Sequence, residues 1–171
     1  MFSADHYGEE VARILKQAGG DERAMPLVRS GAAKSALNRT AAELFPSAPE
    51  PVAAMVGLHL YLGNWDDAHA AADSGERASH YFWHAIVHRQ EPDPGNSAYW
   101  FRMTGQHPVF APLREQAARL GYDTGKSWDP VRFIKYCAAA RPGSEEEKLA
   151  MRVQLAEWRL LFDHCAQGGA R

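Results

Sequence analysis

Cysteine is scarce in this sequence of 171 residues. Cys137 and Cys165 show no C-x-x-C spacing, so two reduced thiols in a cytoplasmic protein are the default expectation. The N-terminus is acidic and carries no apolar core, and therefore no signal peptide is predicted. The longest apolar run, around residues 52–62, is interrupted by His59 and is too short to cross a bilayer. We therefore expect no membrane partner.

An excess of charge of one sign is also missing. The formal net charge is −2, the isoelectric point is about 6.4, and the basic residues are scattered rather than clustered. Bulk electrostatics therefore gives no reason to expect nucleic acid as a partner. A hydrophobic fraction of 46% and a charged fraction of 23% are ordinary for a globular protein, and the length suits one helical domain over residues 1–171.

Strand patterns are absent as well. No segment sustains the alternation of apolar and polar residues, Ile and Thr are rare, and Val falls within helical patterns. Helical spacing predicts an all-α fold of about seven to nine helices, with a core of helix pairs between residues 51 and 121. The expected helices cover about residues 4–17, 51–63, 65–72, 76–90, 96–105, 112–121, 129–140 and 144–165.

Several helix ends carry recognisable signals. Asp129-Pro130 combines an N-cap acceptor with proline at the first helical position. Residues 40–43 (TAAE) and 144–147 (SEEE) match the capping box, although the first box leads into only about one helical turn. The last helix is apolar on two opposite faces, so we expect it to lie between two layers, with a second subunit as the alternative.

The most unusual stretch runs from Ala78 to Phe110 and holds four of the eight histidines. On a helix over residues 76–90, His80, His84 and His88 fall on one narrow stripe, and most of the remaining surface is apolar. Such a helix is normally buried on several sides, and solvent edges favour Lys, Glu or Gln over imidazole. The stripe indicates a partly enclosed groove, with an ordinary solvent edge as the alternative.

The same stripe suggests a site for a divalent transition metal. His84 and His88, at positions i and i+4, project from one helix face, so both imidazoles can reach one ion. Imidazole combined with carboxylate suits Zn, Ni, Fe or Mn. Histidines that donate to carbonyls or carboxylates within helix packing are commoner than ligands, so both interpretations stay open. The candidate further ligands are His69, His107 and, nearby in the sequence, Asp66 or Asp67.

Two arginines and two aromatic residues extend the candidate site. Arg89 and Arg102 could hold an anionic ligand near Tyr99 and Trp100, or each arginine could lie over an aromatic ring. One function class is therefore a small-ligand or metal-binding protein, enzymatic or not, with a cleft lined by histidines and aromatic residues. The alternative is a helical-repeat module that binds a protein segment.

Two resemblances to known families follow from short motifs. GNWDDAH at residues 63–69 and GNSAYWF at residues 95–101 begin 32 residues apart, which resembles the period of about 34 in tetratricopeptide repeats and implies paired helices over about residues 51–105. WHAIVHR at residues 83–89, NSAYWFR at residues 96–102 and HPVF at residues 107–110 resemble an uncharacterised family of bacterial and fungal proteins. Its members share W-H-x-x-x-H-R, N-x-x-Y-W-x-R and H-P-V-F in this order, and the resemblance implies no mechanism.

Overall fold

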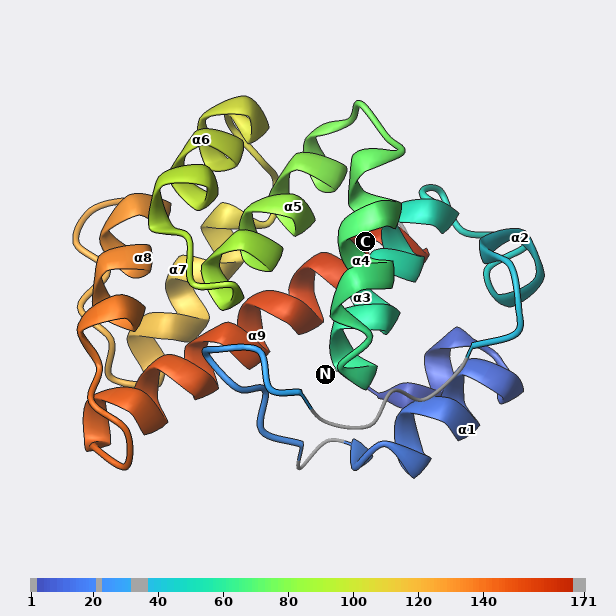
Figure 1. Cartoon of the computed structure of the whole chain (residues 1–171), viewed down its shortest axis with the longest axis horizontal. Coiled ribbons are helices and arrows are strands. Elements are labelled where there is room, and N and C mark those ends of the chain that lie inside the picture. Colours follow the sequence, from blue (N-terminus) through green and yellow to red (C-terminus); the bar gives the residue numbers. More distant parts are fainter. Residues whose placement is uncertain (1–2, 21–22, 32–36, 168–171) are drawn as a thin grey trace.

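Nine α-helices and one short 3-10 helix make up the secondary structure of the described residues, 3–20, 23–31 and 37–167, in the computed structural model (Figure 1). No strand occurs in these ranges, so the all-α prediction is confirmed. The elements in chain order are η1 (Ala4–Tyr7), α1 (Glu9–Gln17), α2 (Ala41–Leu44), α3 (Pro51–Leu62), α4 (Trp65–Asp73), α5 (Ala78–Gln90), α6 (Pro94–Thr104), α7 (Phe110–Arg119), α8 (Pro130–Ala139) and α9 (Glu145–Gln167).

Helix α5 lies at the centre of the molecule and packs against α3, α4 and α6. Figure 1 shows α6, α7 and α8 on one side of it and α3 and α4 on the other, with α9 running diagonally below. Phe82, Trp83 and Ala85 have no measurable exposure, and nearly every residue of the helix is buried. The prediction that this helix is enclosed on several sides is therefore confirmed.

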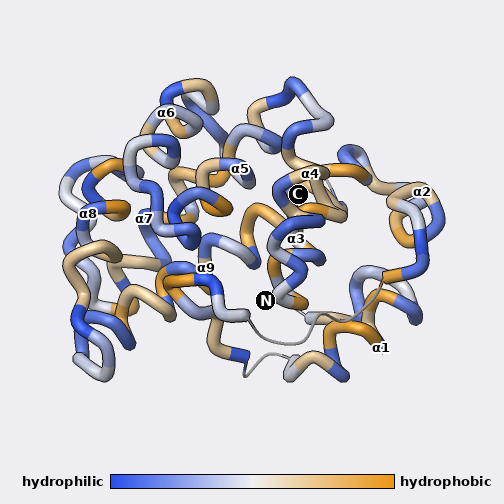
Figure 2. Tube along the Cα trace, in the orientation of Figure 1, coloured by the Kyte–Doolittle hydropathy of each residue, from blue (hydrophilic) through white to orange (hydrophobic). Residues whose placement is uncertain are grey.

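Polar side chains attach the neighbouring helices to backbone carbonyls of α5. The indole N–H of Trp65 in α4 donates to the Val87 carbonyl at 3.2 Å, and Ser97 Oγ in α6 donates to the Ala85 carbonyl at 2.7 Å. These bonds satisfy buried polar groups on both partners, and they fix α4 and α6 against α5. Figure 2 shows that the loop between α4 and α5, at the top of the view, is largely hydrophilic, in contrast to the buried helix α5.

Two of the three predicted caps form as expected, whereas the box at residues 144–147 forms in part: Ser144 Oγ accepts from the Glu147 N–H, but the Glu147 carboxylate accepts from the Gly143 N–H instead of that of Ser144. The side chain of Thr40 accepts from the backbone N–H of Glu43, whose carboxylate accepts from the Thr40 N–H, and α2 is a single turn as expected. The Asp129 carboxylate accepts from the N–H groups of Val131 and Arg132 at the start of α8. Each of these contacts satisfies an amide that the helix itself leaves free.

The first predicted helix, over residues 4–17, differs from the structure. Gly8 has a φ of +87°, which an α-helix cannot contain, and it separates the 3-10 helix η1 from α1. Tyr7 and Val11 on either side are both buried, so the apolar spacing in the sequence reports a common buried face rather than one continuous helix. The pattern could not distinguish these two backbones.

Helix α9 packs against α3, α7 and α8, and Figure 1 shows its first part beside α7 and α8 and its later part beside α3. The tetratricopeptide-like pairing is not confirmed, although α3 packs against α4 and α5 against α6. Within the described part of the chain, no helix is both long enough and apolar enough to cross a membrane.

Candidate metal centre

Three of the four predicted histidine ligands converge. His69 comes from α4, and His84 and His88 come from successive turns of α5. One ring nitrogen from each residue can be chosen so that all three lie within 4.8 Å of one another. Bonds of about 2.0–2.1 Å from zinc to three imidazoles would hold these nitrogens somewhat closer together, so a small side-chain movement would close the site around an ion.

The three rings are held by aromatic contacts. The rings of His84 and His88 are stacked, with centroids 4.8 Å apart, and the indole of Trp100 stacks on His84 at 4.0 Å. His69 lies edge-on to both histidines, at 4.8 and 4.9 Å, and Trp65 lies edge-on to His69. His88 and Trp100 lie on the two faces of His84 and limit rotation of its ring. A metal ion lies in the plane of each imidazole that binds it, so the near-parallel rings of His84 and His88 would turn relative to each other to share one ion.

A carboxylate fixes the proton position on His88. Nδ1 of His88 lies 2.8 Å from Oε2 of Glu91, one turn further along the chain. Because a carboxylate can only accept, Nδ1 donates, and the lone pair of Nε2 remains available for a cation. Metal-binding histidines usually have this kind of carboxylate behind them.

A second carboxylate, from Asp73, lies beside the other two histidines. Its two oxygens are 3.5 Å from Nδ1 of His84 and 4.0 Å from Nε2 of His69. The side chain of Asp73 is 60% exposed and that of His69 is 28% exposed, whereas His84 is buried. The cluster therefore has a buried floor of imidazoles and one edge that water and ions can reach.

The floor of the cluster keeps His84 neutral. Burial lowers the pKa of His84 to about 4, partly opposed by the negative charge of Asp73 and assisted by the neighbouring His69 and His88. Nε2 of His84 is buried and makes no hydrogen bond with the described residues. A buried, unpartnered acceptor or donor costs free energy, and a neutral imidazole is the form that binds metals.

The sequence analysis named Asp66 and Asp67 as candidate ligands and did not identify Asp73. Asp66 lies 3.5 Å from Arg29, and both it and Asp67 are exposed in the first turn of α4. Asp73 follows His69 by four residues on the same helix, and this i, i+4 spacing is the signal that could have identified it.

The structure places His107 away from the other three histidines. Its Nδ1 accepts from the Val109 N–H at 3.2 Å, so Nε2 carries the proton and donates to Ser79 Oγ at 3.2 Å. Ser79 in turn donates to Glu50, whose carboxylate lies 3.7 Å from Nε2 of His164. His107 therefore belongs to a buried polar cluster between α5, α9 and the start of α3.

The arginine and aromatic candidates also separate. Arg89 is buried, donates to Glu157 and Gln154 of α9, and lies over the Phe133 ring at 4.8 Å. Arg102 is exposed and lies 5.9 Å from the centroid of the Tyr99 ring. Of the four residues, only Trp100 contacts the histidine cluster, through His84.

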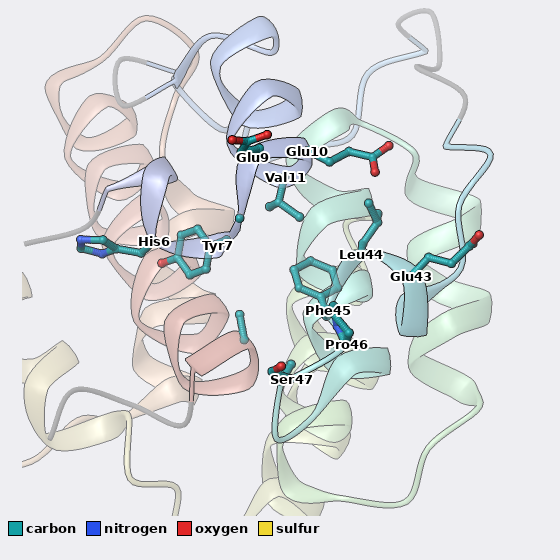
Figure 3. Close-up of a pocket in the computed structure, with 13 residues that line it drawn as sticks. His6, Tyr7, Glu9, Glu10, Val11, Glu43, Leu44, Phe45, Pro46 and Ser47 are labelled. Atoms are coloured by element: carbon teal, nitrogen blue, oxygen red, sulfur yellow. The ribbon is translucent and has the colours of Figure 1, made fainter.

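One cavity at the other end of the molecule lacks this convergence. A cavity of about 400 Å³ between η1, α1 and α2 is bordered by Glu9, Glu10 and Glu43. Figure 3 shows these three carboxylates spread around its edge rather than directed to one point. Glu10 pairs with Arg39 and Glu43 is occupied by the capping box, so neither group is available to a ligand.

No protein-family model, curated protein or solved structure matches this chain. The three motifs at residues 83–89, 96–102 and 107–110 nevertheless lie close together in the structure. The first two occupy α5 and α6, which pack against each other, and the third leads into α7. The first two motifs meet in the ring contact between His84 and Trp100, and Phe82, the residue before the first motif, contacts Phe110 of the third.

Proposed function

We propose that this protein binds a divalent transition metal through His69, His84 and His88, with Asp73 as a fourth ligand. The convergence of three imidazole nitrogens within 4.8 Å carries the proposal. Three nitrogens and one carboxylate oxygen are a ligand set that zinc accepts in tetrahedral geometry. The Glu91 carboxylate behind His88 and the unpartnered Nε2 of His84 support the same assignment.

The proposed ion joins two helices across a short turn. His69 and Asp73 lie on α4 and His84 and His88 on α5, so the metal would cross-link the two helices around residues 74–77. An ion that binds the folded chain more tightly than the unfolded chain raises stability in proportion to the logarithm of its concentration. If Asp73 does not bind the ion, water occupies the fourth coordination position, as in metal sites that perform catalysis.

Metal content and zinc titration test the proposal. Protein purified without an affinity tag should contain close to one equivalent of metal, or take up one equivalent of Zn²⁺ by isothermal titration calorimetry after treatment with EDTA. The double variant His84→Ala/His88→Ala should lose this binding. His69→Gln, a change at the exposed edge, should weaken it at least tenfold without affecting the fold, because one of three imidazole ligands is removed.

The exposed His6 provides the matched control. His6→Gln removes an imidazole remote from the cluster and should leave zinc binding unchanged. Uptake well below one equivalent, or equal uptake by the parent protein and by folded His69→Gln, would show that these histidines serve packing alone.

A further inference from the structure

A separate cavity of about 540 Å³ lies between α6, α7 and the start of α8. Its size falls within the range of small-molecule sites, and Figure 1 shows these three helices grouped on the side of the molecule away from α1 and α2. The end of α6, the first turns of α7 and residues 126–131 line it. None of the proposed metal ligands takes part in this lining.

The lining of the cavity has an excess of positive charge. Arg102, Arg114 and Lys126 face only one lining carboxylate, that of Glu115. The three cations make no ion pair with the described residues, whereas Glu115 lies 3.6 Å from Arg119 on its own helix. Arg114 donates through Nε to the Gly125 carbonyl at 3.3 Å, which leaves its terminal nitrogens for another acceptor.

The N-terminus of α7 adds to this positive potential. The helix begins at Phe110, no side chain caps the preceding Val109, and Phe110 and Ala111 both line the cavity. The N–H groups of Val109 and Phe110 donate to His107, and Pro112 has no N–H, so the amide of Ala111 and the helix dipole supply the attraction for an anion here.

Three aromatic rings also line the cavity, and one of them carries a hydrogen-bond donor without a partner among the described residues. Phe101, Phe110 and Trp128 line the cavity, and Phe101 and Trp128 are buried. The indole Nε1 of Trp128 is buried without a hydrogen bond to the described residues. Because a buried N–H without an acceptor costs free energy, an acceptor brought by a ligand would recover part of that cost after a small movement of the ring.

We propose that this cavity binds a small organic anion, with its carboxylate or phosphate group at Arg102 and Arg114 and its apolar body against Phe101, Phe110 and Trp128. Arginine suits the anionic group because its planar guanidinium donates two parallel hydrogen bonds to carboxylate or phosphate oxygens. The aromatic rings suit an apolar body of about the size of one six-membered ring.

Titration of the full chain in EDTA with benzoate, phenyl phosphate and neutral benzamide tests this site independently of any metal. The readout is the indole N–H resonance of Trp128 in nitrogen-15 NMR spectra, assigned with Trp128→Phe. Benzoate or phenyl phosphate should shift this resonance in a saturable manner, and benzamide should bind at least tenfold more weakly. Tighter binding of phenyl phosphate identifies a phosphate ligand, and tighter binding of benzoate identifies a carboxylate.

Two exposed arginines provide the variant and its control. Arg102→Gln should weaken binding of the tighter probe about tenfold, the effect of losing one charged hydrogen-bond partner. Arg13→Gln, on α1, carries the same change of charge outside the cavity and should bind as the parent protein does. Absence of a saturable shift with both anions, equal binding of benzamide, or equal loss in both variants would overturn the proposal.

Discussion

Individual side chains of α5 show why its histidine stripe does not act as one site. His84 and His88 meet His69, whereas His80, one turn earlier, is buried with its ring against Gly75. The sequence places the three α5 histidines on one face, but the neighbouring helices decide which partner each imidazole meets. Arg89 on the same helix likewise meets Glu157 of α9 rather than a ligand.

The buried pair of Arg89 and Glu157 leads to a stability prediction. Arg89→Met leaves the Glu157 carboxylate buried without its counter-ion and should lower the free energy of unfolding by about 3–5 kcal/mol. The double variant Arg89→Met/Glu157→Leu should lose less than that single variant, because no charge remains in the core. Urea denaturation measures both, and additive losses would contradict this account of the pair.

His107 leads to a prediction about acid stability. Burial, assisted by nearby His164, lowers the pKa of His107 from 6.5 to about 4. As pH falls, the unfolded chain therefore takes up a proton at higher pH than the folded chain does. The contribution of neutral His107 to the free energy of unfolding is complete above pH 6.5 and is lost as pH falls towards 4. His107→Gln should reduce this acid-induced loss by roughly 3 kcal/mol.

Urea denaturation of the parent protein and His107→Gln at pH 7 and pH 4.5 measures this difference. His6→Gln, which removes an exposed imidazole, is the control and should show the loss of the parent protein. Equal losses of unfolding free energy in the parent protein and in His107→Gln would mean that the pKa of His107 is the same in the folded and unfolded states.

At the scale of elements, side chains of α5 and α9 pack directly against the backbone of α3 at Gly57. A Cβ atom at this position would lie 2.7 Å from Trp83 and 2.9 Å from Phe162, and the Gly57 carbonyl accepts from the indole of Trp158 at 2.8 Å. Glycine inside a helix is normally unfavourable, so its presence in α3 reflects the space that the rings of Trp83 and Phe162 require.

Gly57→Ala should therefore destabilise the protein despite the better helix propensity of alanine. Overpacking costs about 1–3 kcal/mol, whereas the gain in propensity is at most about 1 kcal/mol. Gly95→Ala, in the first turn of α6 where a Cβ has ordinary contacts only, should be neutral or slightly stabilising. Thermal unfolding of both variants measures the contrast, and a higher midpoint for Gly57→Ala would contradict this packing.

The sequence predicted the elements better than their contacts. Helical spacing located α3 to α9 to within a few residues, and the caps at Thr40 and Asp129 were identified because their chemistry is local. The break at Gly8 was missed because buried residues continue on the same face across it. The separation of His107 from His84 could not be predicted, since it depends on how α9 and the start of α3 pack against α5.

For the whole molecule, the proposed ion lies between two of the central helices. The metal would hold α4 to α5 on the edge that the rest of the core leaves accessible, and the organic anion would bind in the group of α6, α7 and α8. The two proposed sites share no lining residue, so each can be removed without the other. The histidine cluster remains the central claim.

An anomalous difference map, measured at the zinc absorption edge from crystals grown with ZnCl₂, tests this claim most directly. We expect one strong peak about 2.0–2.1 Å from a ring nitrogen of each of His69, His84 and His88, with an Asp73 oxygen or a water completing a tetrahedron. A map without a peak between these three residues, or with zinc bound only elsewhere on the molecule, would contradict the proposed metal centre.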